Sequence, residues 1–537
     1  MHESLKKIFL SGFRPYAWLA FVCLSLYGSC VMLDFVCCDD DVLISQNQAF
    51  LKNPANVKTA FTQHYFAAEY TNGRYYRPLV TLSFMTDTWI GKGAAWTYHA
   101  TNVILFIGSC LLLFLLLVLI QTLLLATTRA EGNNGIWLPF LGSMLYAVHP
   151  LQAMAIAWIP GRNDTLLACF FLPSLWCFIK YRSTRILRYL WLHLISFSLA
   201  LFTKEVAILI PALCLAWVFL IENKRDIRKW LDETPIFVWM GIGIGWFLFR
   251  GNALGLFMAG DPGPGGPLLT QVSVLAGLLT RYYGKIAFPL HLALLPDPDL
   301  TPIIYGLIFL VLVAIAFWRL KGLPQRLMVF GLLWSTGVLA LSVPFSKSSD
   351  IRNLGLLEHR MVLSWAGVLI AWLVAANEVK WTFSKVWFAL GVICLTLLAS
   401  LSVNRIPDFM DPRTFWGKAV RESPNSSNAW HNYASVLSDD KRYEEAIIYF
   451  QRALRIDPDR QLSHLNLAYV YHQQHRYAEA IEECYKELDI APYSEKACLS
   501  LFHLYLKVGN PSLAQKWRER EQDIRNGKFV QPFKRNR

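Results

Sequence analysis

Charge is scarce in this sequence. Only 17% of its 537 residues are charged and 55% are hydrophobic, whereas a soluble domain carries about 25% charged residues. The shortage comes from long apolar runs, which exclude an ordinary soluble globular protein over most of the length. The composition therefore indicates that most of the chain is an integral membrane protein.

Other absences narrow the class further. The eleven cysteines show neither a disulfide framework nor the CxxC or Cys/His spacing of a metal site, because most lie in apolar runs. The net charge of +13 does not gather in a basic stripe on a soluble face, so nucleic acid is excluded as a partner. The N-terminal apolar run lacks the small-residue site of a cleaved signal peptide and is predicted to remain as the first helix.

Apolar segments recur along most of the chain and predict about eleven membrane spans. Lys6, Lys7 and Arg14 flank the start of the first segment, which predicts a cytoplasmic N-terminus. The basic residues of the later loops then fall mainly on the cytoplasmic side. The predicted segments are residues 16–36, 97–126, 136–160, 164–180, 187–203, 205–221, 234–250, 302–318, 326–344, 360–377 and 384–402.

This topology places the first long loop, residues 37–95, and the C-terminus outside. The apolar residues of the loop predict short helices on the membrane surface. Residues 271–290 are also apolar enough to cross, but a crossing there would move the basic group Arg319, Lys321 and Arg326 outside. The segment is therefore predicted to lie on the outer face or to re-enter the membrane.

Beyond about residue 410 the composition becomes soluble and a repeat appears. Pro424, Pro458 and Pro492 recur at a spacing of about 34 residues, as do Tyr443 and Tyr477. This is the period of the tetratricopeptide repeat, whose paired helices stack into an α-solenoid. Two repeats followed by a degraded, capping pair are predicted.

The predicted class is therefore all-α, a polytopic membrane protein with a C-terminal α-solenoid. The predicted domains are a membrane domain at 1–405, a linker at 406–425, a repeat domain at 426–525 and a basic tail at 526–537.

The first external loop opens on Asp39, Asp40 and Asp41. One interpretation is an acidic loop that helps to orient the first helix, although Asp and Glu contribute little to topology. The other is a catalytic base at the membrane edge, because burial and a neighbouring carboxylate raise a carboxyl pKa. Such a base takes a proton from an acceptor hydroxyl. Asp39 and Asp40 are also the candidate ligands if the protein uses Mg²⁺ or Mn²⁺, and no other ligand cluster is evident.

Further ionisable residues fall on the same external side, where they are costly unless used or paired. Arg77 is either an interfacial arginine or a grip on a phosphate group. Lys204 and Glu205 form either a snorkelling ion pair or a site where the lysine contacts a lipid phosphate. Arg162 and Asp164 are close enough in sequence to pair with each other. The remaining candidates are Arg360, as a second phosphate contact, and His99 and His149, although a lone histidine is more often structural.

The order of these motifs resembles the GT-C membrane glycosyltransferases. The resemblance is closest to the branch with C-terminal tetratricopeptide repeats, which includes the O-mannosyltransferases that target cadherins and many bacterial relatives. The matching stretches are Phe35-Val36 with Asp39-Asp40, Tyr76-Arg77-Pro78-Leu79 with Leu82-Ser83, Tyr98-His99 with Asn102, His149-Pro150 with Ala157-Trp158, Gly161-Arg162 with Asp164, Lys204-Glu205, Phe288-Pro289-Leu290 and Glu358-His359-Arg360.

The resemblance implies a GT-C fold and a polyprenyl-phosphate sugar as donor, used on the outer face of the membrane. It implies that Asp39 or Asp40 deprotonates a Ser or Thr hydroxyl. Arg77, Lys204 and Arg360 would stabilise the departing phosphate. The other matched residues implied in donor binding are His99, His149, Arg162, Asp164 and Glu205.

Two positions depart from the family pattern. The family usually has a glutamate four residues after the proline of its His-Pro motif, where this chain has Met154. One extra residue also separates Val36 from the aspartate pair, which brings Cys38 and Asp41 into question as alternatives. Asp39 and Asp40 keep the assignment because the apolar residues that follow then fall in register.

Three functions remain open at this point. The first is transfer of a sugar, mannose by resemblance, to Ser or Thr of a protein acceptor bound near the repeats. The second is transfer to a cell-envelope glycan or lipid, and the third is a non-catalytic membrane scaffold whose repeats recruit partners. The short repeat array favours a bacterial inner membrane with a periplasmic active site, and in a eukaryote the same topology implies the endoplasmic reticulum.

Overall fold

The computed structural model describes residues 8–36, 39–67, 75–128, 135–223, 234–255, 268–290, 292–295, 300–342, 357–379, 385–528 and 530–533. These residues form helices and turns, with no strand among them, so the predicted all-α class is confirmed. The chain divides into two compact units, Met1–Leu292 with Pro298–Asp411 and Ala293–Asp297 with Pro412–Arg537. We call them the membrane unit and the repeat unit.

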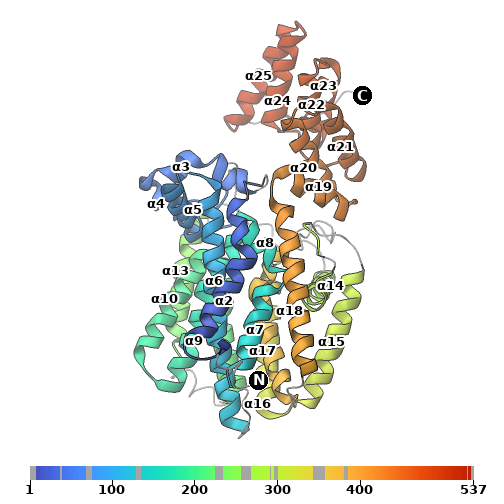
Figure 1. Ribbon diagram of the computed structural model, residues 1–537. Coiled ribbons are helices and arrows are strands. Elements are labelled where there is room, and N and C mark those ends of the chain that lie inside the picture. The colour runs from blue at the N-terminus through green and yellow to red at the C-terminus, as the bar shows by residue number, and fades with distance from the viewer. Residues whose placement is uncertain are drawn as a thin grey trace. The chain divides into compact units, whose positions relative to one another are not determined.

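The membrane unit begins with one helix, continues through the short helices of the first loop, and ends in a bundle (Figure 1). Its first part contains α2 (Arg14–Tyr27), η1 (Gly28–Met32), η2 (Asp41–Ser45), α3 (Gln48–Lys52), η3 (Pro54–Asn56), α4 (Val57–Ala60), α5 (Pro78–Gly91), α6 (Ala95–Thr128), α7 (Trp137–Val148), α8 (Gln152–Ala157), η4 (Ile159–Gly161) and α9 (Arg162–Thr184). Its second part contains α10 (Leu187–Thr203), η5 (Glu205–Ile208), α11 (Leu209–Ala216), η6 (Trp217–Ile221), α13 (Ile236–Leu254), α14 (Leu268–Ala287), α15 (Thr301–Arg319), α16 (Gly322–Ser342), η8 (Glu358–Met361), α17 (Val362–Glu378), α18 (Lys385–Arg405) and η9 (Ile406–Phe409).

Each predicted apolar segment contains helix of the membrane unit, but the predicted span 136–160 is split into α7, α8 and η4. Within the described residues, eight helices are long and apolar enough to cross a membrane, and three shorter apolar helices accompany them, at Trp137–Val148, Leu187–Thr203 and Glu205–Ile221. The prediction of a polytopic membrane protein is therefore confirmed. Burial distinguishes helices at the centre of the bundle from those at its rim. In the most apolar stretch of Glu358–Glu378, 78% is buried, against 11% in that of Thr301–Arg319.

The described residues of the loop predicted to be external, residues 37–95, form short helices and turns. Helices α3, α4 and α5 gather at the end of the bundle that α2 reaches, away from the end where α2 begins (Figure 1). Leu43, Ile44 and Leu51 pack with Val80 and Phe84 of α5 in one buried cluster. The loop is thus held by its own apolar core, and this core fixes the backbone around the aspartates.

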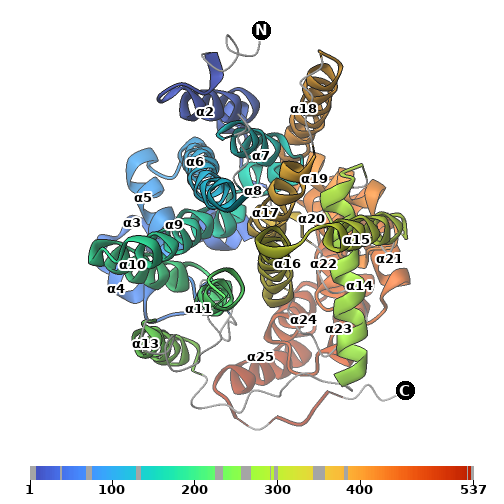
Figure 2. The same cartoon turned by 90° about the horizontal axis from the view of Figure 1, so that it is seen from below.

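Helix α14 crosses the bundle at a steep angle. Figure 2 shows it lengthwise, whereas α11, α13 and α16 are viewed along their axes. The prediction that residues 271–290 do not make an ordinary crossing agrees with this orientation. Near the end of α14, the carbonyl of Ile286 accepts a hydrogen bond from His149 Nε2 over 3.1 Å. His149 therefore ties the end of this helix to the turn between α7 and α8.

Two glycines bring α14 against α15. A Cβ added at Gly284 would lie 1.9 Å from the carbonyl oxygen of Pro302, and one added at Gly306 would lie 1.9 Å from that of Thr280. No side chain fits at such separations, so the two backbones are in contact, as small residues allow between membrane helices. The crossing fixes the position of α14 in the membrane unit.

The repeat unit consists of antiparallel helix pairs. Its helices are α19 (Pro412–Glu422), α20 (Ser427–Asp439), α21 (Tyr443–Ile456), α22 (Ser463–Gln473), α23 (Tyr477–Ile490), α24 (Glu495–Lys507) and α25 (Pro511–Arg525). The repeated small residues Ala446, Ala480 and Ala514 are all fully buried, because the second helix of each pair approaches the first at these positions. The predicted repeats are confirmed, and the degraded third copy still folds as a pair. The predicted linker, residues 406–425, contains η9 and α19.

Substituting Gly284 tests the crossing of α14 and α15. Gly284→Ala adds a Cβ that the Pro302 carbonyl leaves no room for, so the helices must separate. We expect a loss of about 1–3 kcal/mol of stability, as in other overpacked sites, measured as a lower midpoint of thermal unfolding in detergent. Gly277→Ala on the same helix is the matched control, because nothing described lies within 4 Å of a Cβ there. Equal melting of the two variants would contradict the crossing.

Candidate functional site

Asp40 is buried at the start of the first external loop. It is 0% exposed, and the backbone N–H of Val36 donates to its Oδ2 over 2.8 Å. Its other oxygen, Oδ1, has no hydrogen-bond partner among the described residues. Burial raises the pKa of Asp40 well above its usual range, the Val36 N–H opposes this, and the charges of Asp39 and Asp41 add to the rise.

The three aspartates are not equivalent. Asp39 is half-buried, Asp40 is buried, and Asp41 is the first residue of η2, a π-helical turn. Cys37 and Cys38, which bear on the register of this motif, lie outside the described residues. Only Asp40 combines full burial with an oxygen that lacks a partner in the described part of the chain. It is therefore the stronger of the two predicted candidates for a base.

Arg77 lies immediately before α5 and is held by an acid and two rings. Its Nη2 pairs with Glu205 Oε1 at 3.0 Å, and its guanidinium carbon lies 4.6 Å from the ring centre of Tyr75 and 5.5 Å from that of Tyr65. Burial lowers the pKa of Arg77, but the Glu205 carboxylate and the phenols outweigh burial and raise the pKa above its usual range. Arg77 is therefore a permanent cation with a fixed orientation.

Lys204 is paired with Asp164, which corrects two predicted pairings. Its Nζ donates to both carboxylate oxygens of Asp164, at 2.7 and 2.8 Å. The pairing of Asp164 with Arg162 that sequence proximity predicted is therefore wrong. A snorkelling pair between Lys204 and its neighbour Glu205 is wrong for the same reason, since each has its own partner. His359 Nε2 lies 3.8 Å from Asp164 Oδ2.

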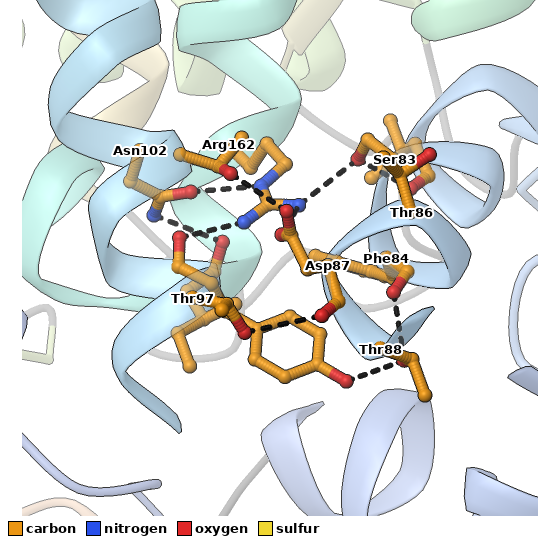
Figure 3. A network of polar contacts seen from close by, with 12 residues as sticks. Ser83, Phe84, Thr86, Asp87, Thr88, Thr97, Asn102 and Arg162 are labelled. Carbon is orange, nitrogen blue, oxygen red and sulfur yellow. Dashed lines mark hydrogen bonds and ion pairs between the residues drawn. The ribbon is translucent and has the colours of Figure 1, made fainter. Parts of the chain in front are cut away.

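Arg162 is fully buried in a polar network of its own (Figure 3). Its Nε donates to Asn102 Oδ1 over 2.8 Å, and its Nη2 donates to the Tyr98 carbonyl over 2.6 Å. Its Nη1 donates to Ser83 over 3.1 Å and pairs with Asp87 at 2.5 Å. These bonds join α5, α6 and α9, so Arg162 positions the helices that carry the site.

Asp87 was not predicted as a partner of Arg162. Its Oδ1 also accepts from Thr101 over 2.6 Å. The signal available in the sequence was an acid within the apolar stretch Pro78–Gly91, because a carboxylate there requires a buried cation.

The two candidate histidines differ. His149 uses both ring nitrogens, since Nε2 donates to Ile286 and Nδ1 accepts from the Leu151 N–H over 3.3 Å. His99 lies near the aspartate loop, with Nε2 3.4 Å from the Asp34 carbonyl, while its Nδ1 has no partner among the described residues. His149 is therefore occupied in the fold, and His99 keeps one nitrogen for further contacts.

Arg360 belongs to a second charged group at the start of α17. Its neighbour Glu358 is 0% exposed and pairs with Arg405 at 2.7 Å and with Lys285 of α14 at 3.6 Å. Tyr282 of α14 lies within electrostatic reach of Arg360, Asp164 and Glu358. The sequence did not indicate Lys285 and Tyr282 as site residues, because residues 271–290 were considered only for whether they cross the membrane.

The structure therefore brings most of the predicted residues into one charged cluster. Arg77, Glu205, Lys204 and Asp164 form two adjacent ion pairs. His359 and Arg360 of η8 approach from another segment, while the Tyr65 hydroxyl lies within electrostatic reach of both Arg77 and Asp39. Tyr65 thus connects the aspartate loop to the cations.

This arrangement suits one type of chemistry. A buried carboxylate with a raised pKa is able to accept a proton, and nearby cations stabilise negative charge on a leaving group. Within the described residues, no group of three or more His, Cys, Asp or Glu side chains is placed to hold a metal ion. Met154, at the position of the family glutamate, is buried in α8.

Comparisons with known proteins give relatives for both units. Family models described as tetratricopeptide repeat match residues 427–460 and 449–482. Protein O-mannosyl-transferase TMTC2 of Mus musculus is 33% identical over 164 residues, which is 30% of this chain and 18% of that protein. TMTC1 of Homo sapiens is 30% identical over 37% of this chain and 23% of its own length. TMTC3 of Homo sapiens is 22% identical over 76% of this chain and 48% of its own length.

The solved structures are more distant. ArnT from Cupriavidus metallidurans in the apo state is 13% identical, with a TM-score of 0.42 over 90% of this chain and 79% of that chain. The same protein bound to undecaprenyl phosphate gives a TM-score of 0.40. A likeness of this size carries no argument about function.

The chain spans between about a fifth and about half of the curated relatives it matches. Within that limit, the resemblance predicted from the order of its motifs is confirmed: the chain is similar in sequence to the protein O-mannosyl-transferases.

Proposed function

We propose that this chain is a membrane glycosyltransferase that transfers a sugar from a polyprenyl-phosphate donor to Ser or Thr hydroxyls of a protein acceptor. The transfer takes place on the extracytoplasmic face, and the sugar is mannose. The observation that carries the proposal is the buried Asp40 carboxylate with one unpartnered oxygen among the described residues, in the same unit as the Arg77 and Lys204 cations. The names of the relatives support the choice of sugar and acceptor.

The proposed reaction is a single displacement. Asp40 takes the proton of the acceptor hydroxyl while the hydroxyl oxygen forms a bond to the anomeric carbon. The bond from that carbon to the phosphate oxygen breaks, and the phosphate leaves with the electron pair. The sugar is transferred with inversion, because the nucleophile enters opposite the leaving group.

The cations act on the leaving group. Arg77 and Lys204 are each held by a carboxylate, so they are oriented before the donor arrives and need little rearrangement. Arg360 adds a third positive charge near Asp164 and Tyr282. Their positive charge is most valuable in the transition state, when the phosphate gains charge.

Two other functions are kept as alternatives. Transfer to a cell-envelope glycan or lipid would use the same membrane residues, and the repeats and the names of the relatives favour a protein acceptor. A non-catalytic scaffold would use the repeats alone. Use of Mg²⁺ or Mn²⁺ at Asp39 and Asp40 stays a prediction, tested by transfer assays after chelation and after readdition of each metal. The bacterial periplasmic or endoplasmic reticulum location also stays a proposal.

Asp40→Asn tests the base directly. The amide keeps the shape of the side chain but cannot accept the proton, so we expect transfer from labelled polyprenyl-phosphate mannose to fall by about 10²–10⁴-fold. Asp41→Asn is the matched control, one residue away at the start of η2, and is expected to keep most of its activity. Equal transfer by the Asp40→Asn variant and the wild type would show that Asp40 is not the base.

The pH dependence of transfer tests the raised pKa of Asp40. A base works when ionised, so the rate rises with pH through the pKa of Asp40, and this acid limb should lie above the value of about 4 of an ordinary carboxyl. Asp39→Asn removes a charge that raises the pKa of Asp40, so the limb should move to lower pH. If the acid limb of the Asp39→Asn variant stays in place and activity is full, the charge of Asp39 does not raise the pKa of Asp40. If the variant loses activity at every pH, Asp39 is the base instead.

The acceptor class is tested by following the label. Membranes that contain the full chain are incubated with labelled donor, and the protein, lipid and glycan fractions are separated. We expect label on protein that is released by β-elimination, as O-linked sugars are. Label confined to the glycan or lipid fraction favours the first alternative, and a chain that neither binds nor uses the donor favours the scaffold.

A further inference from the structure

We propose that Trp158, Tyr282 and His359 line a subsite for the hexose ring of the donor, an inference that rests on the proposed function. None of the three was singled out by the sequence as a ligand-binding residue. They come from three segments, the turn before η4, helix α14 and η8, which meet beside Asp164.

The positions of the three side chains are linked. The rings of Trp158 and His359 have centroids 5.2 Å apart, and His359 Nε2 lies 3.8 Å from Asp164 Oδ2. Tyr282 lies within electrostatic reach of the same Asp164 and of Arg360, the residue after His359. His359 and Tyr282 therefore lie near the carboxylate that holds the proposed phosphate-binding Lys204, and Trp158 joins them through its contact with the His359 ring.

Each side chain carries a buried polar atom without a hydrogen bond. Trp158 is 7% exposed, Tyr282 1% and His359 7%. Within the described part of the chain, Trp158 Nε1, the Tyr282 hydroxyl and His359 Nδ1 have no partner that meets hydrogen-bond geometry. Buried polar groups in folded proteins are nearly always bonded, so three such atoms on linked side chains indicate that another group completes them.

A sugar ring fits these groups better than a phosphate does. The indole N–H only donates, the phenol donates and accepts, and a neutral histidine nitrogen does either, which matches ring hydroxyls that also do both. The oxygens of an ionised phosphate only accept hydrogen bonds, and Arg77 and Lys204 are already proposed to bind the phosphate.

Helix α14 offers a matched pair of tyrosines for the test. Tyr283, the next residue, is also buried, but its hydroxyl bonds Thr336 Oγ1 over 2.7 Å. Tyr282→Phe removes a hydroxyl that interacts with the Arg360 side chain but meets hydrogen-bond geometry with no described atom, so the melting temperature should change little. Tyr283→Phe removes a hydroxyl that is bonded, so it should lower the melting temperature without affecting donor binding.

The experiment measures binding of two lipids to the purified full chain in detergent. The probes are polyprenyl-phosphate mannose and polyprenyl phosphate, which differ in the sugar and in the second phosphate charge of the bare lipid, and each variant is compared with the wild type on each lipid. We expect Tyr282→Phe and Trp158→Phe each to weaken binding of the mannose lipid by about three- to tenfold, the range of a lost hydrogen bond. Binding of bare polyprenyl phosphate should stay within about twofold of the wild type for these variants and for Tyr283→Phe.

The outcomes separate this inference from the function on which it rests. Equal losses for both lipids place Tyr282 on the phosphate and overturn the sugar subsite. No loss for either lipid also overturns it and leaves ordered water as the partner of these atoms. A wild-type chain that binds neither lipid overturns the proposed function itself, whereas a wild type that binds both keeps that function whatever the variants do.

Discussion

The site depends on two consecutive residues, Lys204 and Glu205, each of which forms an ion pair with a residue from a different part of the chain. Lys204 holds Asp164 of α9, and Glu205 holds Arg77 at the start of α5. The Lys204–Asp164 pair is buried, and there an uncompensated charge is costly: removing one partner of a buried pair typically costs about 3–5 kcal/mol. Glu205 is one-third exposed, so its pair with Arg77 contributes less, but a shift of this segment would break both pairs. This constraint places a cation on each side of one short turn.

The surrounding structure keeps these pairs in place by different means. Arg162 joins α5, α6 and α9 through Asp87 and Asn102, so the helices that carry Arg77 and Asp164 cannot separate. On the other side, the glycine crossing with α15 and the bond from His149 to Ile286 hold α14. Glu358 then connects α14 to the start of α17 through Lys285. The cations are therefore preorganised, which is the condition for electrostatic stabilisation of a departing phosphate.

Local pattern was enough to predict the elements but not the pairing of charges. The apolar segments and the 34-residue repeat were readable because both depend on residues close in sequence. Arg162 was expected to meet Asp164, two residues away, yet it meets Asp87 on another helix. Residues at i and i+2 on a helix do not face each other, so the partner had to come from elsewhere.

The sequence by itself determined the membrane character of the chain, its repeats and the set of ionisable residues that are candidates for the site. Amino-acid composition and repeat period do not depend on how the helices pack, so the sequence alone reveals them. Only the tertiary structure decided that Asp40 is the buried aspartate, that each cation has its own carboxylate, and that α14 contributes Tyr282 and Lys285. Burial and long-range contact set these properties, because the cost of removing a charge from water depends on neighbours that lie far away in the chain.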